Sequence, residues 1–199
     1  MMKNVRFFTL IEVLAVVAII VILSLIGYGS YSYATNAAKT ARSTALLKNL
    51  ESGLESFYGK YGYYPQSDTG GKLNPVFFTL GADNTVGKIK FGVTAAAAEL
   101  EDSSTDPIKK AQFDTFAKAV DLEAFKQNRD ADGKLADAWG VIIYYRAPGV
   151  FKSGGYDLIS AGPDGLFSSD RADTPVDIAD VTKYRNAAGE HVCDDLFDF

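Results

Sequence analysis

The sequence predicts an α+β protein in which one long N-terminal helix packs on a small antiparallel β-sheet, with an extra insertion of helix and loops. Three observations lead to this fold class. No proline interrupts the chain between Phe8 and Tyr64, so a helix can run through this region. Short β-rich runs bounded by Gly and Pro follow after residue 140. A hydrophobic content of 47% is that of a chain with a packed core.

The first half of the predicted helix is apolar over residues 7–28, where Glu12 is the one charged residue. At about 1.5 Å per residue this run extends about 33 Å, enough to cross the hydrocarbon core of a bilayer. Lys3 and Arg6 lie close before the run, which predicts a cytoplasmic N-terminus and an exported body. We therefore expect a transmembrane helix over 8–28.

Glu12 bears on three interpretations of this run. A cleavable secretory signal has a shorter apolar region and no carboxylate in it. A plain anchor leaves unexplained a charge that costs about 2.5–3.5 kcal/mol inside a membrane. In the third interpretation, the helix is only stored in the membrane and later packs beside copies of itself. There the carboxylate meets a free α-amino group, which requires cleavage of the chain a few residues before Glu12.

The run FTLIEVL at residues 8–14, after a short basic leader, resembles the N-terminus of type IV pilins and of the pseudopilins of type II secretion. The resemblance implies that a prepilin peptidase removes residues 1–7 and methylates the new amine of Phe8. It also implies that Glu12 draws each subunit into a growing filament. Phe7 stands before the cut bond, where the family nearly always has Gly.

The second half of the helix, over 29–60, is predicted to be the periplasmic part of the stem. Its apolar residues recur every three or four positions, which is typical of an amphipathic helix with one face on a core, at Leu47, Leu50, Leu54 and Phe57. Gly59, Gly62 and Pro65 predict that the helix ends near Tyr58.

Residues 61–199 are predicted to form one globular domain with an insertion over about 66–136. Within the insertion we expect a short hairpin around 86–93 and an amphipathic helix over 108–125. Asp106 is the expected N-cap of that helix, and Pro107 suits its first turn. After the insertion, strands are expected at 141–145 and 156–160.

The region after the insertion is similar to the major pseudopilin of type II secretion. The similarity rests on the runs DAWG at 137–140, YYRAPG at 144–149 and YDLISAGPDG at 156–165. Together with the N-terminus it covers about the first 65 residues and 137–180. The resemblance implies a pilin-like fold, in which the insertion is additional.

An acidic loop follows these motifs, and the turn residues Gly162, Pro163 and Gly165 begin it. Its carboxylates are Asp164, Asp170, Asp173, Asp177 and Asp180. Calcium takes six to eight such oxygens in flexible loops, whereas composition alone slightly favours a solvated acidic loop. The resemblance implies a structural calcium site formed by the Ala161 carbonyl, Asp164 and Asp177. Asp173 is then the expected further ligand, with Asp170 as its substitute.

Other candidate sites are weaker. The run NRDADG at 128–133 imitates the start of an EF-hand loop, but Trp139 occupies the place of the bidentate Glu, so we expect a turn. His191 and Cys193 are too few for a metal site, and on a strand they point to opposite faces. A net charge of −5 without clustered basic residues argues against nucleic-acid binding. We expect no enzymatic activity.

The sequence thus predicts a structural subunit that polymerises into a periplasmic pseudopilus for type II secretion. Its expected partners are its own copies, other pseudopilins, the prepilin peptidase, an inner-membrane assembly platform with an ATPase, and membrane lipid before assembly. The expected location is the inner membrane, as a single-pass protein with a periplasmic C-terminal domain, and then the filament. The alternatives are a subunit of a type IV pilus for adhesion, motility or DNA uptake, and a monomeric membrane-anchored binding module that uses the insertion.

Overall fold

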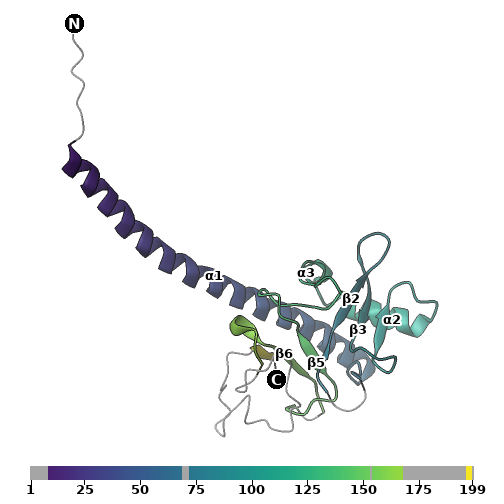
Figure 1. Cartoon of the computed structure of the whole chain (residues 1–199). Coiled ribbons are helices and arrows are strands. Elements are labelled where there is room, and N and C mark those ends of the chain that lie inside the picture. The colour runs from purple at the N-terminus through teal and green to yellow at the C-terminus, as the bar shows by residue number, and fades with distance from the viewer. Residues whose placement is uncertain (1–8, 69–71, 153, 168–195, 199) are drawn as a thin grey trace. The chain divides into compact units, whose positions relative to one another are not determined.

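The computed structural model describes residues 9–68, 72–152, 154–167 and 196–198, and for 25–30 and 196–198 only the backbone. The chain divides into two compact units, Met1–Ala38 and Lys39–Phe199. The long helix α1, Leu10–Tyr61, contributes to both units (Figure 1). All other described elements belong to the second unit.

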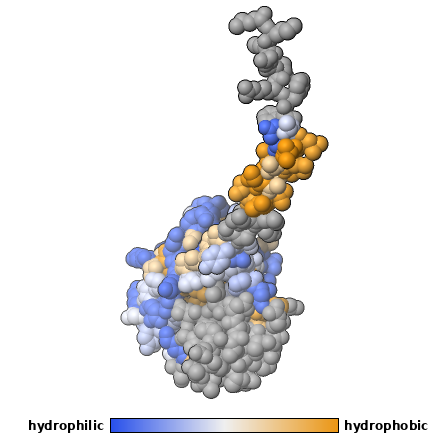
Figure 2. Space-filling model, turned by 90° about the vertical axis from the view of Figure 1, so that its left-hand side faces the viewer, coloured by the Kyte–Doolittle hydropathy of each residue, from blue (hydrophilic) through white to orange (hydrophobic). Residues whose placement is uncertain are grey.

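In the first unit, α1 carries exposed apolar side chains. Ile11 is 74% exposed and Leu23 is 63% exposed. Figure 2 shows hydrophobic surface along the part of the chain that precedes the globular body. Within the described residues, no helix combines the length and the apolarity that a membrane crossing requires.

The C-terminal end of α1 lies slightly beyond the predicted position. The helix passes through Gly59 and ends at Tyr61. Gly62 follows with φ 75°, a left-handed conformation that glycine adopts without a Cβ penalty. Its N–H donates to the Tyr58 carbonyl at 2.8 Å, which satisfies one of the last free carbonyls of the helix.

The second unit contains two small antiparallel sheets that lie against the second half of α1 (Figure 1). One sheet has the order β1-β5-β6-β7, formed by Asn74–Pro75, Tyr144–Arg146, Asp157–Ser160 and Leu196–Asp198. The other has the order β2-β3-β4, formed by Phe77–Leu80, Val86–Lys90 and Glu99–Glu101. The α+β class is thus confirmed, and the insertion supplies a complete second sheet where only a hairpin was expected.

The predicted helix over 108–125 is in fact two helices, α2 (Pro107–Ala117) and α3 (Leu122–Gln127). Asp106 caps α2 as expected, because its side chain accepts from the N–H of Ile108 at 2.8 Å. The prediction of a single helix was wrong, because Asp121 caps a new helix within the predicted range. The Asp121 carboxylate accepts from the N–H groups of Glu123 and Ala124, while its own N–H donates to the Asn49 side chain of α1.

The predicted apolar face of α1 is confirmed. Leu47, Leu50, Leu54 and Phe57 are at most 3% exposed and form one core with the sheets and with α2. On the adjacent flank of α1, Gly53 allows α2 to approach closely. A Cβ at Gly53 would lie 2.5 Å from Cε2 of Phe116, so no larger residue fits without movement.

Two buried polar networks hold the motifs that follow the insertion. Arg146 and Asp157, each 1% exposed in its side chain, form an ion pair between β5 and β6. The Asp157 carboxylate also accepts from the backbone N–H groups of the loop at Val150, Phe151 and Lys152. The pair therefore joins the sheet to the loop that connects its two strands.

The second network links the DAWG motif to the stem. The Asp137 carboxylate accepts from the N–H groups of Trp139 and Val141, and from the Ser160 hydroxyl at 2.6 Å. The N–H of Ala138 donates to the hydroxyl of Ser43, which is fully buried on α1. These bonds fix the turn before β5 against the helix.

Candidate functional site

Glu12 lies in the first turn of α1 and is bound to Thr9. The N–H and the hydroxyl of Thr9 each donate to Oε2 of Glu12 at 2.8 Å. The N–H of Glu12 in turn lies 3.4 Å from Oγ1 of Thr9. This reciprocal arrangement is a capping box, which satisfies donors that the start of a helix leaves free.

The structure therefore gives Glu12 a local role that our sequence analysis missed. The spacing T-x-x-E before an apolar run is the signal that could have revealed it. Leu10 and Ile11 beside it are at least 74% exposed, so the carboxylate stands on an apolar surface. Such a surface can pack against another apolar helix, and the carboxylate can attract a cationic group there. Phe7 and Phe8 lie outside the described residues.

The acidic loop begins at a short 3-10 helix, η1 (Gly162–Asp164). Ala161, fully buried, precedes this turn. Oδ1 of Asp164 accepts from the N–H of Leu166 at 2.8 Å. Two predicted calcium donors, a backbone carbonyl and a carboxylate, thus belong to one turn.

The remaining predicted ligands, Asp170, Asp173 and Asp177, lie outside the described residues, as do His191 and Cys193. In the part of the chain that the structure describes, no group of three or more His, Cys, Asp or Glu side chains could hold a metal ion. The two described donors match the oxygen chemistry of calcium, which prefers carbonyls and carboxylates. A full site would require oxygens from the segment 168–195.

The EF-hand-like run forms a turn, as predicted. The N–H of Gly133 donates to the Asp130 carbonyl, and the Asp130 side chain accepts from the N–H of Lys134. Asp132 forms an ion pair with Lys134 at 3.1 Å. Both carboxylates therefore serve the turn itself.

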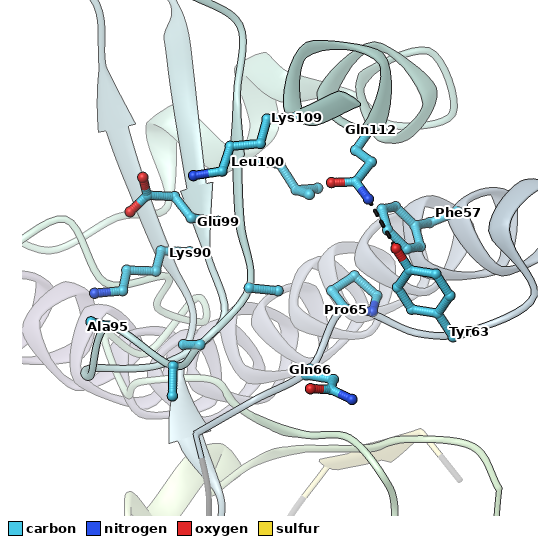
Figure 3. Close-up of a pocket in the computed structure, with 13 residues that line it drawn as sticks. Phe57, Tyr63, Pro65, Gln66, Lys90, Ala95, Glu99, Leu100, Lys109 and Gln112 are labelled. Atoms are coloured by element: carbon cyan, nitrogen blue, oxygen red, sulfur yellow. Dashed lines mark hydrogen bonds between the residues drawn. The ribbon is translucent and has the colours of Figure 1, made fainter. Parts of the chain in front are cut away.

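A cavity of about 590 Å³ lies between the end of α1, α2 and the start of β4, and sequence reasoning did not predict it. Figure 3 shows Lys109 and Gln112 of α2 above the cavity, with Lys90 and Glu99 on one side and Tyr63 on the other. Nε2 of Gln112 donates to the Tyr63 hydroxyl at 3.0 Å. The lining combines ammonium groups, amides and a carboxylate with two aromatic rings and other apolar side chains, which suits binding of a ligand with polar and apolar parts.

Asp68 holds one wall of this cavity in place. Its carboxylate accepts from the N–H groups of Val93 and Thr94 and from the Thr94 hydroxyl, which anchors the turn that leads into Ala95–Ala98. Burial alone would raise the pKa of Asp68, but the Thr94 hydroxyl and the two N–H groups outweigh burial and lower that pKa. The carboxylate therefore stays ionised as an acceptor.

Comparison with known proteins gives one match. Residues 2–28 match the family model of the prokaryotic N-terminal methylation motif. The match includes Phe7, Phe8 and Glu12 and ends where the predicted apolar run ends. No curated protein and no solved structure matches the chain.

Proposed function

We propose that this chain is a pilin-like structural subunit that polymerises into a filament. A prepilin peptidase cuts between Phe7 and Phe8 and methylates the new amine, and the N-terminal helix holds the subunit in the inner membrane until assembly. The observation that carries the proposal is the methylation motif over residues 2–28. The exposed apolar surface around Glu12 supports it, because such a surface is buried when helices of several copies pack together.

The capping box suggests how the subunit tolerates Glu12 before assembly. An ionised carboxylate in an apolar medium is costly unless it is hydrogen-bonded. Thr9 supplies two donors to it within the same copy. On assembly, the cationic amine of a neighbouring Phe8 adds an opposite charge, so the carboxylate gains a partner without first losing its cap.

Among filaments, we favour the pseudopilus of type II secretion. The similarity of 137–180 to the major pseudopilin supports this, and Cys193, the single cysteine, cannot close an intrachain disulfide of the kind found in many pilins. Other pseudopilins and an assembly platform with an ATPase are the partners in this proposal. A type IV pilus subunit is the nearest alternative. A monomeric anchored binding module is a further candidate, favoured by the cavity that the insertion lines.

Two variants separate the assembly role of Glu12 from its capping role. Glu12→Gln removes the charge but keeps a residue that serves in capping boxes, whereas Thr9→Val removes the cap and keeps the charge. We expect Glu12→Gln to abolish filament growth and export in cells that carry the assembly machinery, and Thr9→Val to reduce them only partly. Undiminished filaments with Glu12→Gln would overturn the proposal.

Mass spectrometry of the native N-terminus tests processing directly. The expected chain begins at methylated Phe8. A chain that begins at Met1 would contradict cleavage and would favour the anchored binding module.

We also propose that the acidic loop binds a structural calcium ion through the Ala161 carbonyl, Asp164, Asp177 and Asp173, with Asp170 as a substitute. The donor types at the η1 turn support this. A bound ion stabilises the folded state, so chelation should lower the melting temperature of the Lys39–Phe199 unit. Asp164→Ala with Asp177→Ala should remove this sensitivity, whereas Asp132→Ala, in the ordinary turn, should keep it. No effect of a chelator on the parent protein would refute the site.

A further inference from the structure

In the second unit, the insertion covers one flank of α1. Four α1 side chains donate to backbone carbonyls or hydroxyls of residues 115–121: Asn49 to Asp121, Ser52 to Ala119, Ser56 to Thr115 and Lys60 to Thr115. These residues are spaced three, four and four positions apart, so they follow one line along the helix. The adjacent face of α1 packs on the hydrophobic core. Two sides of α1 are therefore covered by other parts of the same copy.

The remaining side of α1 is open. Its exposed residues are Ala41, Ala45, Lys48, Glu55 and Gly59, which are three, four or seven positions apart. Ser52 marks the border with the covered flank, because it is exposed but donates to the Ala119 carbonyl at 3.1 Å. Lys48 and Glu55 are the two charged members of this open face. Lys48 makes no ion pair with any described residue, and the Glu55 carboxylate accepts only a neutral donor there, the Tyr64 hydroxyl at 2.9 Å.

Lys48 and Glu55 cannot neutralise each other within one copy. They are seven residues apart, so their positions differ by about 10 Å along the helix axis, although they point in nearly the same direction. In a second, parallel copy at the same height, Lys48 would face Lys48 and Glu55 would face Glu55. Like charges in such positions repel.

We infer that the open face of α1 packs against a second copy of this chain that is parallel and displaced along the helix axis, so that Lys48 of one copy pairs with Glu55 of the next. This rests on the proposed filament, in which all copies have the same orientation. The contact is heterologous, since one copy supplies Lys48 and the other Glu55, and repetition of such a contact produces an open filament.

The direction of the displacement agrees with the proposed role of Glu12. In both pairs the cationic group precedes the acidic group in the sequence, by four residues for the Phe8 amine and Glu12 and by seven for Lys48 and Glu55. Both pairs therefore require displacement in the same direction, by about 6 Å for the Phe8 amine and Glu12 and by about 10 Å for Lys48 and Glu55. The ion pair is exposed, so it selects the displacement between copies rather than supplying most of the affinity.

Cysteine cross-linking tests the displacement. In full-length Cys193→Ser chains expressed with the assembly machinery, Lys48→Cys combined with Glu55→Cys should give a ladder of disulfide-linked oligomers in isolated filaments. Each single variant should remain monomeric on a non-reducing gel. A disulfide within one copy is excluded, because two Cα atoms so far apart along a helix cannot be bridged.

The matched control uses the covered flank at the same spacing. Asn49→Cys combined with Ser56→Cys should give no ladder, because residues 115–121 cover these positions. Dimers from Lys48→Cys alone, or a ladder from the control pair, would overturn the inference. Filaments that form without a ladder in the Lys48 and Glu55 variant would also overturn it while leaving the proposed function intact. Absence of filaments in the parent would overturn both.

Charge reversal provides a second readout. Lys48→Glu and Glu55→Lys should each reduce the number of filaments per cell, because each places like charges opposite one another. The double reversal restores opposite charges and should recover most of the parental number. A double variant as impaired as the worse single variant would contradict the pairing.

Discussion

Replacement of Arg146 by Met tests whether the buried ion pair stabilises the second unit. Arg146→Met keeps an apolar side chain of similar length but leaves the Asp157 carboxylate buried without its cation. Loss of one partner of a buried pair costs about 3–5 kcal/mol, which is a large part of the roughly 5–15 kcal/mol stability of a typical domain. The free energy of unfolding should fall by that amount.

The exposed pair Lys110–Asp102 is the matched control. Its atoms are 2.7 Å apart, but both side chains are about half exposed, at 49% and 51%. Lys110→Met should therefore lower the free energy of unfolding much less than Arg146→Met does, because water screens an exposed pair. Urea unfolding of the Lys39–Phe199 unit, followed by the fluorescence of Trp139, measures both values. If Arg146→Met lowers the free energy of unfolding no more than Lys110→Met does, burial does not make the Arg146–Asp157 pair stabilising, and the reasoning is refuted.

A double variant separates the ion pair from the loop. Arg146→Met with Asp157→Leu removes both charges, and such replacements of buried pairs are often neutral. Here Asp157 also accepts from the N–H groups of Val150, Phe151 and Lys152. Each N–H that loses its partner and stays buried costs about 1–3 kcal/mol, so stability should recover incompletely. Full recovery would show that the loop finds other partners.

Two further predictions concern Gly53 of α1 and Tyr64, which follows α1 and donates to Glu55 on it. Gly53→Ala should destabilise the second unit by about 1–3 kcal/mol in urea unfolding, because the added Cβ meets Phe116. Gly59→Ala is the control: no atom lies within 4 Å of its added Cβ, so it should be neutral or stabilising. Equal effects would contradict the close contact with α2. Burial and the Glu55 carboxylate raise the pKa of the Tyr64 hydroxyl from 10.0 to about 12. The folded state favours the protonated phenol, so this contribution to stability is complete below pH 10 and is lost as the pH rises towards about 12. Tyr64→Phe should remove this loss when the free energy of unfolding is measured between pH 10 and about 12.

The core face of α1 was predictable from the sequence, and the other faces were not. Leu47, Leu50, Leu54 and Phe57 recur at helical spacing, and local periodicity is enough to identify a buried face. Nothing local distinguishes Asn49 and Ser56, which contact the insertion, from Lys48 and Glu55, which remain exposed. That difference depends on where residues 115–121 pack, far away in the sequence.

The insertion shows the same limit. Asp106 and Pro107 marked the start of α2 correctly, because a cap acts on its immediate neighbours. The break before α3 depends on Asp121, which caps α3 and also bonds to Asn49 of α1, so a long-range contact helps to hold it. The cavity beside Lys109 and Tyr63 likewise arises where three separate segments meet.

By itself, the sequence determined the stem helix, its apolar first half with Glu12, and the methylation motif. These features depend on neighbours within a few residues, so order along the chain is sufficient. Only the tertiary structure decided that Arg146 and Asp157 form a buried pair and that the insertion covers one flank of α1. Burial and contact depend on packing between distant segments, and local spacing does not encode that packing.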